Sequence, residues 1–153
     1  MSDLKIPVEM LLDIREGRYA IDPTGVGPLR FIRVSEMKNK NSRHKGWKIF
    51  QTQHSDDLVT RVRISPNGKL VEKISWTNDQ LTETALAIIT DPWGAAIRYG
   101  QELGQCCRCG KSLTDERSRW YGIGPECEIL WPEVIYEVNE NRGPYEESHN
   151  GRG

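Results

Sequence analysis

The residues with the clearest chemistry are four cysteines in the C-terminal third of the chain, Cys106, Cys107, Cys109 and Cys127. Cys106-x-x-Cys109-Gly110 has the form of a zinc knuckle, in which two thiolates hold one ion from a tight turn and the glycine relieves the backbone. Seventeen residues separate Cys109 from Cys127, a gap typical of small zinc modules. Gly124-Pro125 predicts a helix start, so Cys127 falls in a first turn, where the helix dipole favours a thiolate. We predict that these three cysteines, Cys106, Cys109 and Cys127, bind one structural zinc ion in a treble-clef-like layout.

The fourth ligand of this zinc ion is left open by the sequence. A treble clef would have a cysteine near Leu130, and there is none. Cys107 and Asp115 are the first candidates, and Glu126, a histidine or water are the others; Cys107 could also replace Cys106. The spacing and the glycine favour zinc over packed free thiols, over a strained disulfide between the two adjacent cysteines and over a redox Cys-x-x-Cys site.

The same residues resemble an uncharacterised family of small bacterial and phage proteins. Its C-terminal domain carries Cys-x-x-Cys-Gly, then Leu-Thr-Asp, a serine and Gly-Ile-Gly-Pro-x-Cys, matched here at residues 106–110, 113–115, 118 and 122–127. The resemblance extends over roughly residues 17–128 and is strongest from Asp91 onward. It implies a zinc-binding module and a bacterial or phage setting, and it implies no reaction.

The sequence patterns of the segments that must position the cysteines predict an α+β fold. Alternating apolar and polar residues indicate an antiparallel sheet of about four or five strands, at 18–21, 29–34, 47–53, 59–64 and 70–74. Ser65-Pro66-Asn67-Gly68 is a strong turn signal between the last two. The period then becomes helical, with Asn78 or Asp79 as a cap for one helix and Asp91-Pro92 as the start of the next. We therefore divide the chain into a strand-rich part at 1–76, linking helices at 77–104, a zinc-knuckle module at 105–136 and a disordered tail at 137–153.

Composition narrows the class of protein. Hydrophobic residues make up 37% of the 153 residues, which indicates a thin core that a bound metal would reinforce. No apolar stretch has the length of a membrane span, and the first residues lack the apolar run of a signal peptide. We expect a cytoplasmic protein, in the bacterial host if it is phage-encoded, and a reducing compartment makes metal binding a better use of cysteines than disulfides.

Enzymatic motifs are missing from the sequence. The three histidines, His44, His54 and His149, have no recognisable nucleophile or acid–base context, and there is no phosphate loop or dinucleotide fingerprint. We therefore predict no catalytic residues and no enzyme. The enzymatic alternative is a zinc ion whose fourth position is open to substrate.

Basic residues gather in the predicted strands although the net charge is only −1. Residues 30–73 contain 11 Lys and Arg against 4 Asp and Glu. Cations interleaved with aromatics suit phosphate contact and base stacking, whereas a half-buried sheet with its arginines outward would give the same alternation. The candidates for nucleic-acid contact are Arg30, Arg33, Arg43, Lys45, Trp47, Lys48, Arg61 and Arg63.

Aromatic residues beside the knuckle indicate a different partner. We expect Trp120, Tyr121 and Trp131 to be exposed and to contact a protein. The favoured interpretation is a non-enzymatic zinc-binding protein that acts as an interaction module, as a phage factor would when it modulates a host complex. Nucleic-acid binding through the basic strands is the alternative.

Overall fold

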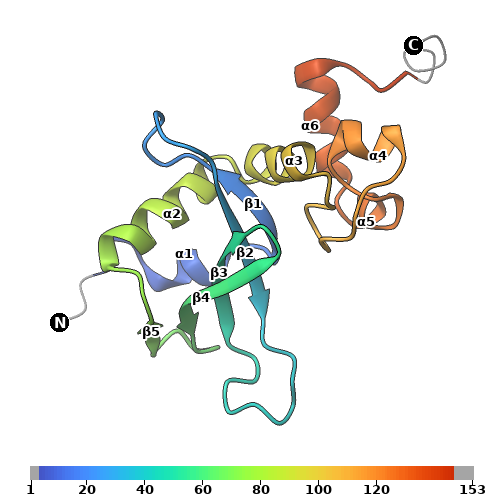
Figure 1. The fold of residues 1–153 in the computed structure, drawn as a ribbon. Coiled ribbons are helices and arrows are strands. Elements are labelled where there is room, and N and C mark those ends of the chain that lie inside the picture. Colours follow the sequence, from blue (N-terminus) through green and yellow to red (C-terminus); the bar gives the residue numbers. More distant parts are fainter. Residues whose placement is uncertain (1–3, 147–153) are drawn as a thin grey trace. The chain divides into compact units, whose positions relative to one another are not determined.

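A computed structural model describes residues 4–146, which form two compact units (Figure 1). Among these residues, unit 1 consists of 4–17 and 21–90, and unit 2 consists of 18–20 and 91–146. The chain is α+β, as predicted, with an N-terminal antiparallel sheet and a cysteine cluster in the C-terminal region. The elements in order are α1 (Val8–Leu12), β1 (Gly17–Ile21), β2 (Arg30–Glu36), β3 (Lys48–His54), β4 (Asp57–Ile64), β5 (Val71–Lys73), α2 (Asn78–Thr90), α3 (Pro92–Leu103), α4 (Glu116–Tyr121), α5 (Pro125–Leu130) and α6 (Pro132–Arg142).

The sheet has five strands in the order β1-β2-β3-β4-β5, so each strand lies beside its sequence neighbours. The pairs from β2 to β5 are antiparallel, with Val34 opposite Phe50 and Phe50 opposite Val62. The predicted turn at 65–68 joins β4 to β5, where the N–H of Gly68 donates to Ser65 O at 2.8 Å. Gly68 has a φ of 76°, a conformation in which glycine avoids the strain that other residues would meet.

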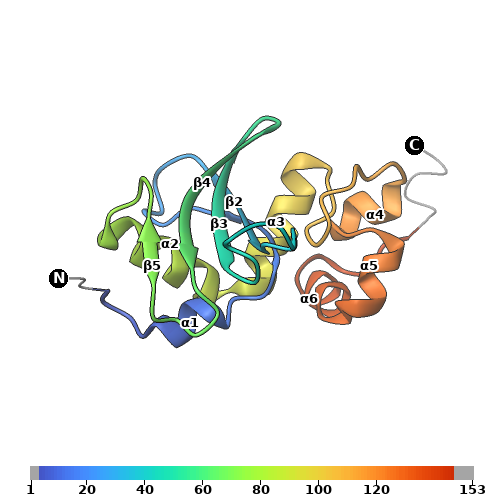
Figure 2. The same ribbon diagram turned by 90° about the horizontal axis from the view of Figure 1, so that it is seen from below.

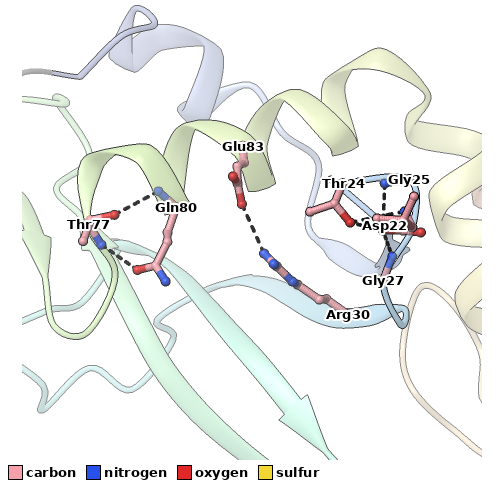
Figure 3. Close-up of polar contacts among 9 residues, drawn as sticks. Asp22, Thr24, Gly25, Gly27, Arg30, Thr77, Gln80 and Glu83 are labelled. Carbon is pink, nitrogen blue, oxygen red and sulfur yellow. Dashed lines mark hydrogen bonds and ion pairs between the residues drawn. The ribbon is translucent and has the colours of Figure 1, made fainter.

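Helices α1 and α2 lie on one face of this sheet (Figures 1 and 2). Buried apolar residues alternate along β2 and β4, which indicates that the core of unit 1 lies between this face and the two helices. The buried side chains include those of Leu11, Ile32, Val34, Phe50, Val62, Ile64, Leu81, Ala85 and Ile88. The cap of α2 differs from the prediction. Thr77, not Asn78 or Asp79, forms a capping box, because Thr77 Oγ1 accepts from Gln80 N at 3.1 Å and Gln80 Oε1 accepts from Thr77 N at 2.9 Å (Figure 3).

Helix α3 opens unit 2 as the sequence predicts. Asp91 is its N-cap and accepts from Gly94 N at 3.1 Å, and Pro92 is the first helical residue. Gly104 ends the helix in the left-handed conformation, with its N–H bonded to Gly100 O. The knuckle therefore begins directly after α3.

The C-terminal end is more helical than predicted. Helix α6 continues to Arg142, so the prediction of a disordered tail is wrong for residues 137–142, and the tail residues 147–153 lie outside the described part. Val134 and Val138, four residues apart, are both buried and give α6 an inward face. None of the helices within residues 4–146 has the length and apolarity needed to span a membrane.

Candidate metal centre

The first two cysteines of the cluster lie on a tight turn after α3. An isolated bridge between Gln105 and Ser112 closes this turn, and Cys106 N donates to Lys111 O at 2.8 Å. Gly110 N bonds to Cys106 O at 2.8 Å, and the φ of Gly110 is 83°. The segment is therefore a knuckle, as the Cys-x-x-Cys-Gly pattern predicts.

The third cysteine comes from α5, which begins at Pro125 after the N-cap Gly124. Cys127 is the third residue of this helix, so it lies in the first turn, as predicted. The backbone also joins the two parts, since Gly124 N lies 3.4 Å from Cys106 Sγ, and Cys107 N donates to Gly122 O at 3.0 Å. These contacts bring the start of α5 against the knuckle.

The three sulfur atoms of Cys106, Cys109 and Cys127 all lie within 4.8 Å of one another. A tetrahedral zinc ion with Zn–S bonds of about 2.3 Å holds its sulfur ligands about 3.8 Å apart. The cluster is thus of a size that could hold one metal ion. Cys106 and Cys127 are buried, whereas Cys109 is exposed.

Neither of the two first candidates for the fourth ligand belongs to this cluster. The carboxylate of Asp115 is the N-cap of α4 and accepts from Ser118 N at 3.0 Å, a hydrogen bond that lowers the pKa of Asp115. Cys107 is fully buried, and burial raises the pKa of its thiol well above the usual range. Within residues 4–146, no fourth Cys, His, Asp or Glu joins the three cysteines.

The surroundings of the cluster shift the pKa values of Cys106 and Cys127 in opposite directions. Burial alone would raise the pKa of Cys106, but backbone N–H groups of Gly124, Cys109 and Arg108 donate to its sulfur and hold the pKa below its usual value. For Cys127, burial is the largest influence and raises the pKa to about 11, and the two neighbouring thiols act in the same direction. The Arg108 guanidinium, 3.5 Å from Cys127 Sγ, opposes this shift. A metal cation bound to Cys127 would favour its thiolate and oppose the rise in its pKa, and metal binding to thiols releases protons.

Two contacts that support the knuckle were missed by sequence reasoning. Arg18, almost ninety positions upstream, donates its backbone N–H to Cys107 O at 2.8 Å. A Cβ atom on Gly110 would lie 2.4 Å from the Arg18 guanidinium carbon, so the knuckle glycine also makes room for this side chain. A Cβ on Gly100 would lie 2.1 Å from Gly122 O, so α3 approaches the end of α4 at a position where a side chain has no space. Gly100, Gly110 and Gly122 all lie in the part of the chain that resembles a known family. That resemblance was the one feature of the sequence that could have pointed to these contacts.

The aromatic residues predicted to be exposed beside the knuckle are mostly part of the core, and that prediction is wrong. Tyr121 is 3% exposed and donates its hydroxyl to Asn139 Oδ1 at 2.8 Å, and Trp131 is 5% exposed. Trp120 is half-buried, with its indole N–H donated to Gly143 O at 3.1 Å and the Arg142 guanidinium 3.6 Å from its ring centre. Trp120 and Tyr121 thus contact α6, which the sequence had not predicted as a helix. The burial of their apolar area stabilises unit 2.

Most of the predicted nucleic-acid residues are engaged within unit 1. Arg30 pairs with Glu83 at 3.4 Å (Figure 3), and the ammonium of Lys48 donates to the backbone carbonyls of Leu12 and Ile14 at the end of α1. On the strands, Arg63 pairs with Glu72 at 3.0 Å and Arg61 Nε donates to Thr52 Oγ1 at 2.8 Å. Of the remaining four, Arg33 is a half-buried strand residue, and Arg43 and Lys45 are exposed cations of a loop. The ring of Trp47 is half-buried and in edge contact with His44.

Comparison with known proteins adds one finding. Residues 96–128 match a family described as a family of unknown function (DUF6011). The matched segment contains all three cluster cysteines and both closely approaching glycines, and it is a minor part of the 153 residues. No curated protein and no solved structure gives a significant match. The similarity to an uncharacterised family therefore covers the three-cysteine cluster and most of α3.

Proposed function

We propose that this chain is a small zinc-binding protein in which the metal is structural and whose role is to bind a protein partner, not to catalyse a reaction. The observation that carries the proposal is the group of three cysteine sulfurs within 4.8 Å of one another. Thiolates are soft ligands that select zinc among the common divalent ions of the cell, and tetrahedral zinc fits this spacing.

A structural role for the metal is supported by its position, because it would join the knuckle to α5. Helices α4 and α5 have six residues each, which is too short for a helix to be stable without tertiary contacts. A zinc ion on Cys106, Cys109 and Cys127 would link the knuckle to the first turn of α5 across the intervening segment, and this link would replace part of an apolar core.

A binding role is favoured because the polar side chains near the centre are used to hold the fold. Asp115 caps α4, Arg117 pairs with Glu128, and Arg119 donates to Leu113 O at 3.1 Å. A general base would need a carboxylate or imidazole within reach of a metal-bound water. The resemblance to bacterial and phage proteins supports a phage factor that modulates a host complex in the cytoplasm.

Native mass spectrometry of the purified chain, with and without a chelator, tests the zinc proposal. We expect one zinc ion per chain. Cys127→Ala should abolish binding, whereas Cys107→Ala, which removes an equally buried thiol outside the cluster, should retain the ion. Zinc loss in both variants, or in neither, would contradict the assignment of the ligands.

A second candidate, nucleic-acid binding, is favoured by one observation in unit 1. The loop between β2 and β3 carries three exposed cations, Lys40, Arg43 and Lys45, which form no ion pair with the described residues. Such a loop can contact phosphates without disturbing the sheet.

Mobility-shift assays with single- and double-stranded DNA at two salt concentrations test this candidate. Binding should weaken in Arg43→Ala/Lys45→Ala, whereas Lys5→Ala/Lys111→Ala, with the same charge removed elsewhere, should bind as the native chain does. The absence of any shift at low salt would end the idea.

A further inference from the structure

Helices α5 and α6 expose large apolar side chains that the fold of unit 2 does not use. Ile129 is 77% exposed, Leu130 is 58% exposed and Tyr136 is 69% exposed. The other large apolar side chains that are exposed within residues 4–146 belong to unit 1. These three residues are called the outer α5–α6 surface below.

The inward sides of the same helices are already occupied. Cys127 is buried on α5, and Val134 and Val138 are buried on α6. Tyr136 lies midway between the two valines in sequence and therefore points away from them on a helix with 3.6 residues per turn. Solvent exposure of three such side chains has an unfavourable hydration cost that a binding partner would relieve.

The charge around this surface indicates the chemistry of the partner. Residues 125–142 contain five glutamates and one arginine. Glu128 pairs with Arg117, and the Arg142 guanidinium lies over the Trp120 ring. The four remaining carboxylates belong to Glu126, Glu133, Glu137 and Glu140, of which all but Glu137 are exposed.

We propose that Ile129, Leu130 and Tyr136 form a docking surface for a basic amphipathic segment of a partner protein. Apolar side chains of that segment would cover the three residues, and its Lys and Arg residues would face the surrounding glutamates. A second copy of this chain fits less well, because it would bring the same acidic helices together. The inference rests on the proposed zinc-binding interaction function and names the surface and partner class for it.

The surface is also tied to the metal centre. Cys127 lies on α5 two positions before Ile129, so an ion bound at the cluster would fix the helix that presents the apolar side chains. Removal of the metal should therefore abolish docking, whereas changes on the outer surface should abolish docking and leave the metal bound. This difference separates a failure of the docking proposal from a failure of the zinc proposal.

Fluorescence anisotropy with model peptides provides the test. The zinc-loaded full chain is titrated at about 0.15 M salt with a labelled helical peptide of leucine and lysine in amphipathic order. Two control peptides replace every lysine by glutamate or scramble the order of the lysine peptide. We expect the amphipathic basic peptide to bind at least about tenfold more tightly than either control.

Matched variants then locate the binding surface. Ile129→Ser/Leu130→Ser/Tyr136→Ser should weaken peptide binding by about tenfold or more, because the apolar anchors are lost, and zinc content should be unchanged. Leu70→Ser/Ile74→Ser removes exposed apolar side chains from unit 1 and should have no effect. If the triple variant loses its zinc, Glu133→Gln/Glu140→Gln serves instead, and it should weaken binding of the basic peptide severalfold.

Three results would overturn the docking proposal. The first is equal binding of the native chain and of a zinc-loaded surface variant. The second is equal binding of the basic and acidic peptides. The third is concentration-dependent dimerisation of the native chain that the triple variant abolishes, which would identify a second copy as the occupant.

Discussion

The two units of this chain stabilise themselves in different ways. Unit 1 buries mainly aliphatic side chains, together with Phe50, from three central strands and two helices. In unit 2, the buried residues include three cysteines, three alanines and three tyrosines, and its short helices approach one another through glycines. An extended sheet can thus bury enough apolar area by itself, whereas a segment with short helices needs another source of stability, for which a metal ion is suited.

Metal removal should give the largest difference between the two units, because it should destabilise unit 2 and leave unit 1 folded. Structural zinc in small modules contributes roughly 10–16 kcal/mol of binding free energy, most of which appears as folding free energy. After chelation, hydrogen exchange should become fast at Gly110, Leu113 and Gly122, whose N–H groups are bonded around the knuckle, and should stay slow in β3 and β4. Unchanged protection in unit 2 after complete zinc removal would show that its own core suffices.

Truncation of Phe50 should destabilise unit 1 and leave unit 2 folded. Its side chain is fully buried in the sheet core, so Phe50→Ala should destabilise unit 1 by about 3–5 kcal/mol. Val59→Ala, on the neighbouring strand but 38% exposed, is the control and should cost under about 1 kcal/mol. Urea denaturation followed by circular dichroism measures both changes, and zinc content should remain one ion per chain. Loss of zinc in the Phe50 variant would mean that the two units do not fold separately.

Addition of one methyl group should be enough to disturb unit 2. Gly100→Ala places a Cβ about where Gly122 O lies, and the overpacking should cost about 1–3 kcal/mol. Glu102→Ala, an exposed substitution on the same helix, is the control and should be nearly neutral. Thermal unfolding of the zinc-loaded variants compares them. Equal melting temperatures would contradict the close approach of α3 to the end of α4.

Removal of the α4 cap should have the smallest effect. Asp115→Ala should destabilise unit 2 by about 1 kcal/mol, a typical value for an N-cap carboxylate, and leave the zinc stoichiometry unchanged. Asp115→Asn keeps a capping oxygen and should lose less stability. Zinc loss in Asp115→Ala, measured by inductively coupled plasma mass spectrometry, would instead place this carboxylate at the metal.

Local sequence patterns were sufficient to predict most of unit 1. Alternation identified the strands, and the Pro-Asn-Gly turn signal identified the β4–β5 connection, because each depends on neighbouring residues. The three clustered cysteines were likewise predictable, since a knuckle and a helix start are local motifs. The α2 cap was missed because Thr77, Asn78 and Asp79 are all competent caps, and only the position of Gln80 selects among them.

Tertiary contacts explain what the sequence did not reveal. Arg30 and Arg63 were candidates for nucleic-acid contact, and in the structure they pair with Glu83 of α2 and Glu72 of β5. Tyr121 is buried, and its hydroxyl donates to Asn139 Oδ1 on α6. The second half of α6 was interpreted as tail because all of residues 137–142 except Val138 are polar. The spacing of Val134 and Val138 was the one local signal that could have extended this helix.

X-ray absorption spectroscopy at the zinc edge tests the central claim most directly. For the zinc-loaded full chain, we predict three sulfur scatterers at about 2.3 Å and one oxygen or nitrogen scatterer. Cys107→Ala should give the same spectrum. Four sulfur ligands in the native chain, or the loss of one sulfur in Cys107→Ala, would contradict a centre built from Cys106, Cys109 and Cys127.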